Sequence, residues 1–153
     1  MKYAMKLLMA APLALVTPLA ASAAGAGNQH PAYLHALSDL RRAYALIEHR
    51  PGDKAVNGQE EFAKSAISKA IDDVKRASVD DGKSLKDIPP PQASADHSGR
   101  LHEAADLLRE VRSDIDREED DPKAKSAQQA ALKDVEAALE ATKQGITDVE
   151  SHK

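Results

Sequence analysis

No cysteine and no tryptophan occur among the 153 residues, and only 3% of the residues are aromatic. Without cysteine the chain cannot form disulfides, and it cannot hold a thiolate metal site, an iron–sulfur cluster or a covalently attached c-type haem. The three methionines, Met1, Met5 and Met9, all lie in the first nine residues. If that segment is removed, the protein contains no sulfur, which excludes soft Cu(I) sites and histidine–methionine haem ligation. Any metal would be bound by nitrogen and oxygen ligands only.

The first 23 residues, MKYAMKLLMAAPLALVTPLAASA, have the pattern of a secretory signal peptide. Lys2 and Lys6 form a positive n-region, residues 7–19 form the apolar core, and the final ASA triplet is a small-residue cleavage site. The apolar run contains two prolines and is too short to span a bilayer with margin. We therefore predict cleavage after Ala23 and export, most simply to a bacterial periplasm, without a stable membrane anchor.

Excess positive charge is also missing. The whole chain has 21 basic and 25 acidic residues, and loss of Lys2 and Lys6 with the signal peptide changes its net charge from −4 to −6. A mildly acidic surface argues against nucleic acid and anionic membranes as partners. The remaining chain, about 130 residues, is long enough for one modest domain with its own core.

Residues that favour strands are scarce, whereas Ala, Leu, Glu, Lys, Asp and Arg are abundant. Apolar residues recur at alternating three- and four-residue spacing in four segments, as is typical of amphipathic helices. The predicted helices are residues 31–49, 58–80, 98–118 and 123–149. The predicted apolar stripes are Tyr33, Leu37, Leu40, Tyr44 and Ile47 in the first segment, Ala63, Ile67, Ala70, Val74 and Ala77 in the second with Phe62 beside them, Leu101, Ala104, Leu108, Val111 and Ile115 in the third, and Leu132, Val135, Leu139, Thr142, Ile146 and Val149 in the fourth.

These four helices predict an all-α fold, an antiparallel up-down-up-down four-helix bundle that follows the signal peptide. The bundle would occupy residues 24–153. We expect hairpin one at 30–82, a Pro-rich linker at 83–97 and hairpin two at 98–150.

The two hairpins also resemble each other in sequence. A shift of 67 positions places HPAYLHALSDLRR, residues 30–42, on HSGRLHEAADLLR, with the shared pattern H-x3-L-H-x3-D-L-x-R. The second helices of the hairpins align more loosely, at a shift of 64 positions. This pattern indicates a duplicated helical hairpin. Superposition of residues 30–82 on 97–149 is therefore expected to need an approximate twofold rotation.

In the predicted topology the first and third helices run parallel, so their histidines and aspartates would meet at one end of the bundle. Imidazole and carboxylate groups are suitable ligands for Zn(II), Ni(II) or Cu(II). The candidate metal ligands are His30, His35, Asp39, His97, His102 and Asp106. Three alternatives stay open. The His–Asp pairs are also compatible with surface ion pairs, the positive end of a helix disfavours a bound cation, and His30 and His97 could simply flank the helices.

The sequence shows no catalytic pattern. It lacks H-E-x-x-H, G-x-S-x-G, a Gly-rich phosphate loop and a cysteine nucleophile. A di-iron bundle would need inward-facing Glu and a Glu-x-x-His motif, which is absent. We therefore predict a protein that is not an enzyme, with no catalytic and no cofactor-binding residues.

The segments HPAYLHALSDLRRA and GRLHEAADLLRE, with the acidic REEDD at 117–121, resemble an uncharacterised family of small exported bacterial helical-bundle proteins. The resemblance covers most of the mature chain and implies the fold and export but no activity. The expected architecture is also similar to that of periplasmic four-helix cytochromes. Their haem motifs are missing, because the chain has no C-x-x-C-H and no methionine after the signal peptide.

Two functional hypotheses follow. In the first, the chain is an exported, non-enzymatic binding protein that holds a divalent transition metal at its histidine- and aspartate-rich end. In the second, it is a metal-free structural, interaction or chaperone-like protein of the cell envelope, with a protein partner.

Overall fold

The computed structural model describes residues 31–48, 53, 57–77, 96–117 and 122–152. These residues form four α-helices and no strand, which confirms the predicted all-helical class. The helices are α1 (Pro31–Ile47), α2 (Gly58–Ala77), α3 (His97–Ile115) and α4 (Pro122–Ser151). Each begins within one residue of its predicted start. The signal peptide and nearly all of the linker predicted at 83–97 lie outside the described residues.

The start of α2 is stabilised by residues next to it in the sequence. Asn57 accepts a hydrogen bond from the backbone N–H of Glu60 at 3.0 Å, which satisfies one of the free donors of the first turn. Glu60 and Glu61 lie in the first turn, and Lys75 and Arg76 lie in the last. Acids at the positive end of a helix and bases at the negative end are both favourable.

The free backbone groups at the two ends of α3 are capped by different kinds of side chain. At its start the Asp96 side chain accepts a hydrogen bond from the Gly99 N–H at 2.8 Å. Beyond its end, the buried Gln128 of α4 donates from Nε2 to the carbonyl oxygens of Ile115 and Arg117, at 2.7 and 2.6 Å. A side chain of the next helix thus satisfies carbonyl groups for which α3 itself has no donor.

The four helices pack as a bundle around an apolar core that contains residues from every helix. The predicted stripes face this core almost throughout, with Tyr44, Ala77, Leu132 and Val149 only partly buried at its margin. Phe62 was expected beside the second stripe, but it is 56% exposed. Many core positions are alanine, so the helices approach closely while each such position buries little apolar area.

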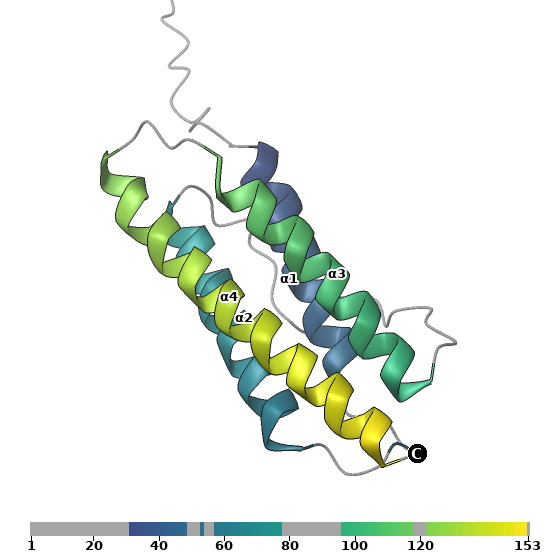
Figure 1. Ribbon diagram of the computed structural model, residues 1–153. Helices are drawn as coiled ribbons and strands as arrows, with labels where there is room; N and C mark the ends of the chain where they lie inside the picture. The colour runs from purple at the N-terminus through teal and green to yellow at the C-terminus, as the bar shows by residue number, and fades with distance from the viewer. Residues whose placement is uncertain (1–30, 49–52, 54–56, 78–95, 118–121, 153) are drawn as a thin grey trace, which may run out of the picture.

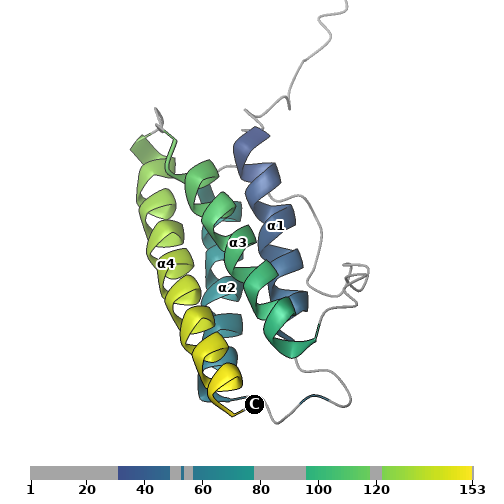
Figure 2. The ribbon, with the colours of Figure 1, turned by 45° about the vertical axis from the view of Figure 1, so that its right-hand side comes forward.

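The order of the helices differs from the predicted up-down-up-down arrangement. In Figure 1, where colour follows the chain, α1 and α4 run downward and α2 and α3 run upward (Figures 1 and 2). Side-chain contacts agree: Arg42, near the end of α1, lies 3.5 Å from Glu103, near the start of α3. The main packing partners are α2 with α4 and α1 with α3, followed by α3 with α4 and α1 with α2.

The predicted order is therefore wrong, because α1 and α3 are antiparallel neighbours instead of parallel helices. The physical reason is that α2 ends and α3 begins at opposite ends of the bundle. Periodicity fixes which face of a helix is apolar, but it carries no information on the direction in which a long connection leads the next helix. The duplication itself stays a prediction. Among the residues described, no helix is both long and apolar enough to cross a membrane.

Candidate functional site at the start of α3

The five predicted metal ligands that the structure describes do not gather at one end of the bundle. His30 lies outside the described residues, and His35 and Asp39 lie in the first half of α1. His97 and His102 lie in the first two turns of α3, and these turns lie at the opposite end of the bundle from the start of α1 (Figure 1).

The separation of His35 from His102 follows from the antiparallel packing of α1 and α3. Asp39 is within electrostatic range of Glu110, and His35 lies one turn further from the start of α3. The eight residues from His102 to Glu110 span about 12 Å at 1.5 Å per residue. Ligating atoms in one metal shell lie roughly 3–4 Å apart, so His35 and His102 are too distant for a shared ion.

Asp39 instead belongs to a charged contact between α1 and α3. Partial burial raises the pKa of its carboxyl group, the nearby Arg42 lowers it, and the carboxylates of Glu110 and Asp114 raise it further. The net direction is upward. Asp39 is therefore an acid held near other acids.

His97 forms the most buried contact among the predicted ligands. Its Nε2 lies 3.0 Å from Oε1 of Glu60, and the two side chains are 11% and 1% exposed. Glu60 belongs to α2, so this pair joins the first turns of two helices. A buried carboxylate is stabilised only if it is paired, and a protonated imidazole supplies the opposite charge.

His102 forms a second, exposed pair with Glu150 of α4, at 3.1 Å between Nε2 and Oε1. The Ser98 hydroxyl donates a hydrogen bond to the same carboxylate oxygen at 2.8 Å. Asp106 is exposed and pairs with Arg109 of its own helix.

Two further contacts complete this end of the bundle. The buried Arg100 of α3 forms an ion pair with Asp53, which precedes α2. Asn57 donates from Nδ2 to the Asp148 carboxylate of α4 at 3.0 Å. We refer to the paired side chains around the first turns of α3 as the α3-start cluster. Its members are Asp53, Glu60, His97, Ser98, Arg100, His102 and Glu150.

Five members of the cluster were not recognised from the sequence: Asp53, Glu60, Ser98, Arg100 and Glu150. For Glu60 a signal was present. Glu60 continues the apolar stripe of α2, three residues before Ala63, and its burial could have been inferred from that spacing. His97 likewise lies four residues before Leu101. Arg100 gives no such signal, because only the position of Asp53 decides its burial.

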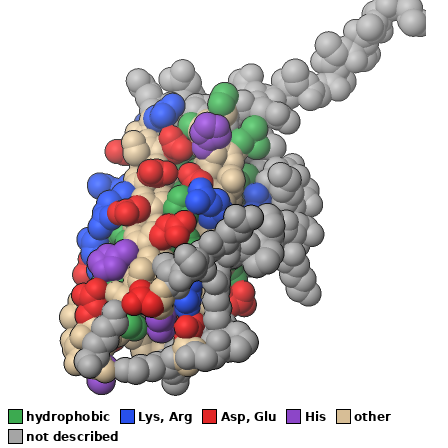
Figure 3. All heavy atoms as spheres, turned by 90° about the vertical axis from the view of Figure 1, so that its right-hand side faces the viewer, with side chains coloured by type: hydrophobic (Ala, Val, Ile, Leu, Met, Phe, Trp, Pro, Cys, Tyr) green, Lys and Arg blue, Asp and Glu red, His purple; other side chains and the backbone are tan. Residues whose placement is uncertain are grey.

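Chemically, the cluster offers imidazole nitrogens and carboxylate oxygens in pairs. Within the described part of the chain, no three or more His, Cys, Asp or Glu side chains are grouped so that they could hold a metal ion. On the face with α1 and α3, acidic and basic side chains intermix, and the visible histidines are spread along the bundle (Figure 3). The contacts of the α3-start cluster thus link α3 to α2 and α4 at this end of the bundle.

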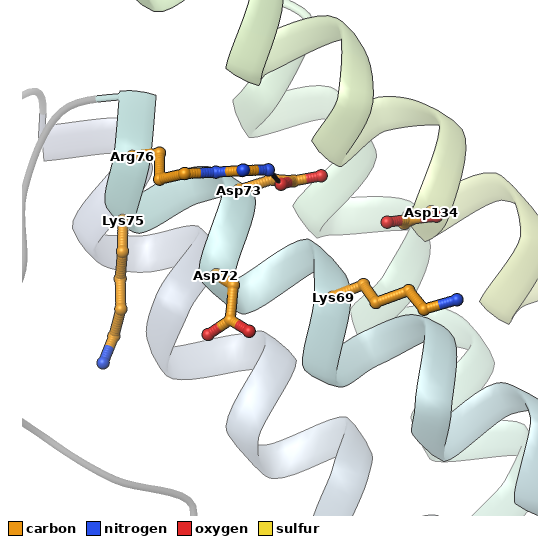
Figure 4. Close-up of a pocket in the computed structure, with 6 residues that line it drawn as sticks. All are labelled: Lys69, Asp72, Asp73, Lys75, Arg76 and Asp134. Carbon is orange, nitrogen blue, oxygen red and sulfur yellow. Dashed lines mark hydrogen bonds and ion pairs between the residues drawn. The ribbon is translucent and has the colours of Figure 1, made fainter.

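A separate surface hollow of about 470 Å³ lies between α2 and α4 (Figure 4). Arg76 reaches across to Asp73, a buried carboxylate, and the two form an ion pair. The lining residues are Lys69, Asp72, Asp73, Lys75, Arg76 and Asp134. Because positive and negative groups are equally represented, the lining gives no preference for a ligand of either charge.

No family model, curated protein or solved structure matches the chain. The resemblance to exported helical-bundle proteins stays a prediction from the quoted segments.

Proposed function

We propose that this protein is an exported, non-enzymatic four-helix bundle that acts as a structural or interaction module of the cell envelope. The observation that carries this proposal is the use of the histidines. His97 and His102 each contact a carboxylate of a different helix, at 3.0 and 3.1 Å. These imidazoles therefore have a role in holding α3 to α2 and α4.

The N-terminal sequence supports export. A positive n-region, an apolar core and a small-residue cleavage site occur in the order that secretion requires. Fractionation of cells that express the full chain tests this part. The expected product is a periplasmic protein whose first residue is Ala24, identified by intact mass and N-terminal sequencing. An uncleaved chain that stays in the cytoplasm would contradict export.

Metal binding is the second candidate, and two pairs of the α3-start cluster provide donors of a suitable kind. The pairs His97–Glu60 and His102–Glu150 each present one nitrogen and one oxygen donor. Such donors suit Zn(II), Ni(II) or Cu(II), with water as further ligand. This candidate differs from the predicted site, because it leaves out His30, His35, Asp39 and Asp106 and adds Glu60 and Glu150.

Equilibrium dialysis of the mature chain with each of these three ions separates the two candidates. The proposed structural role predicts no stoichiometric retention of metal and no change in thermal midpoint when a chelator is added. One retained ion per chain that is lost in His97→Ala and His102→Ala, but kept in His35→Ala, would establish the second candidate.

The structural role has a readout of its own. His97→Ala is expected to lower the thermal midpoint by several degrees, because it leaves Glu60 as a buried charge without its imidazole partner. His102→Ala removes an exposed pair and is expected to have a smaller effect. His35→Ala is the matched control on an exposed helix surface. Equal midpoints for all three variants would contradict the structural role.

A further inference from the structure

The dipeptide Asn57–Gly58 stands at the start of α2, and it is the only place in the chain where glycine follows asparagine. The second asparagine of the chain, Asn28, is followed by glutamine. The backbone nitrogen of the next residue can attack the side-chain amide of an asparagine, and a side chain on that residue hinders its approach. Because glycine has no side chain, Asn57 is the more reactive of the two asparagines.

The structure leaves the backbone nitrogen of Gly58 open to this reaction. Gly58 is exposed, and among the described residues no atom beyond its chain neighbours and its own helix backbone lies within 4 Å of the place that a Cβ would occupy. Its N–H belongs to the first turn of α2, where backbone donors have no acceptor within the helix. The attacking nitrogen is therefore accessible.

Two hydrogen bonds fix the amide of Asn57 in the folded protein. Its Oδ1 accepts from the backbone N–H of Glu60, and its Nδ2 donates to Oδ2 of Asp148, both at 3.0 Å. The first contact lies within α2, whereas the second joins the start of α2 to the end of α4, which lie at the same end of the bundle (Figure 1). Attack at Cγ makes the planar amide tetrahedral and expels Nδ2, so the contact with Asp148 must break during the reaction.

We propose that Asn57–Gly58 is a deamidation site whose rate is set by the hydrogen bond between Asn57 and Asp148. The Gly58 nitrogen bonds to Cγ of Asn57, the Cγ–Nδ2 bond breaks, and Nδ2 leaves as ammonia with the proton of the Gly58 N–H. Water then opens the cyclic imide at either of its carbonyl groups, which yields aspartate or isoaspartate. In total, water is consumed and ammonia is released, and no oxidant or reductant takes part.

Deamidation changes the contact between α2 and α4 irreversibly. A carboxylate at position 57 cannot donate to Asp148, and it places a second negative charge beside that side chain. Aspartate is still a good helix cap, so the product with the normal backbone loses only the contact with α4. Isoaspartate also lengthens the backbone by one carbon atom, which displaces the cap of α2. Both products therefore weaken this end of the bundle.

Incubation of the mature chain at neutral pH, followed by tryptic digestion and mass spectrometry, tests the site. Trypsin releases residues 55–64, which contain Asn57 and no other asparagine, and it releases Asn28 in a separate peptide. We expect Asn57 to convert to a mixture of aspartate and isoaspartate, and Asn28 to convert more slowly. A sample that is digested without incubation corrects for conversion during digestion.

Gly58→Ala tests the role of the glycine. The added methyl group has open space in the folded protein, so this variant should fold as the unchanged chain does. It hinders the approach of the nitrogen to Cγ, and we expect the conversion of Asn57 to slow by at least about tenfold.

Variants at the exposed Asp148 test the contact with α4. Asp148→Ala removes an acceptor that is charged but exposed, so the conversion of Asn57 should become about three- to tenfold faster. Asp148→Asn keeps an acceptor oxygen and should leave the rate close to that of the unchanged chain. Glu140→Ala is the matched control, because it removes an exposed acid of the same helix that pairs with Lys143. It should leave the rate unchanged.

Asn57→Asp reproduces the product with the normal backbone and tests the structural consequence. It should lower the thermal midpoint by a few degrees, and this loss should be smaller when Asp148→Asn is also present. An equal loss in both backgrounds would contradict the repulsion between the two carboxylates.

Three results would overturn the proposed site. The first is an unchanged Asn57 in the folded chain over the time in which the chain unfolded in urea converts completely. The second is the same rate in Asp148→Ala as in the unchanged chain. The third is an acceleration by Glu140→Ala as large as that by Asp148→Ala. Circular dichroism establishes that each variant is folded. If Asp148→Ala is not, the comparison of Asn57→Asp in the two backgrounds decides the role of Asp148.

Discussion

The first turns of α2 and α3 lie at the same end of the bundle, and their charges are arranged in opposite ways. α2 begins with Asn57 as its cap and with two glutamates in its first turn, which is favourable without any other element. α3 begins with three basic side chains, whose counter-charges all come from outside the helix. The cap and the charges at the start of α2 thus follow local rules, although Glu60 also contacts His97 of α3, whereas the charges at the start of α3 depend on the tertiary structure throughout.

Glu60 connects the two starts, and its truncation should have the largest effect on stability. Glu60→Ala removes a fully buried carboxylate from its contact with the partly buried His97, and removal of one partner of a buried pair lowers the free energy of unfolding by up to about 3–5 kcal/mol. Urea unfolding followed by circular dichroism measures this loss. The control Glu61→Ala removes the exposed carboxylate that pairs with Lys64 and should lower the free energy by less than Glu60→Ala does, by about 1 kcal/mol. Equal losses would remove the distinction between the buried and the exposed acid of the same turn.

The caps of the two helices provide a second comparison. Asn57→Ala and Asp96→Ala each remove a side chain that accepts a hydrogen bond from a first-turn N–H, worth about 1 kcal/mol. The salt dependence should differ. The Asp96 carboxylate also offsets the positive charge at the start of α3, so the effect of Asp96→Ala should shrink in 1 M salt, whereas that of Asn57→Ala should not. Identical salt dependence would show that both caps act through the hydrogen bond alone.

Gly145 of α4 lies against both starts, and its replacement should be stabilising. A Cβ added there would lie 3.5 Å from Cγ of Glu60 and 3.8 Å from Cδ1 of Leu101, which are ordinary van der Waals distances. Since glycine inside a helix is less favourable than alanine by about 1 kcal/mol, Gly145→Ala should raise the free energy of unfolding by up to that amount. A lower thermal midpoint would mean that the packing around Glu60 has no room for one methyl group.

Asp39 on α1 lies near other acidic side chains, whereas the acids around the start of α3 lie next to basic side chains. Burial and the carboxylates of Glu110 and Asp114 hold its pKa above the ordinary value, although Arg42 acts against them. A raised pKa means that its ionisation disfavours the folded state. The protonated side chain therefore contributes to stability. This contribution is fully present below the pKa of Asp39 in the unfolded chain and is lost as the pH rises through its pKa in the folded protein.

Asp39→Asn should therefore stabilise the protein slightly at pH 7, by less than about 1 kcal/mol, since the side chain is partly exposed and near Arg42. The gain should vanish at about pH 3.5, where the aspartate is itself neutral. Urea unfolding of both proteins at the two pH values measures it. Destabilisation at pH 7 would show that the ion pair with Arg42 outweighs burial and the neighbouring acids.

Sequence periodicity was sufficient to predict the four helices and most of the residues of the apolar core. The stripe from Leu101 to Ile115 faces the core as predicted, and so does that from Ala63 to Val74. Amphipathic spacing is a local property, because residues three or four positions apart lie on the same face of a helix whichever element that face packs against. Phe62 was the exception, since an aromatic residue beside a stripe lies close to the boundary between core and surface.

The direction of α3 and the grouping of its charges were decided only by the tertiary structure. The sequence places His35 and His102 at matching positions of a repeated pattern, but whether two such positions meet depends on whether their helices run parallel or antiparallel. Because α1 and α3 are antiparallel, the repeat separates these histidines and brings His97 to Glu60 instead. Helix faces are encoded by neighbours three or four residues apart. The pairing of charges from different helices depends on how all four helices pack, and the spacing of residues within one helix does not determine that packing.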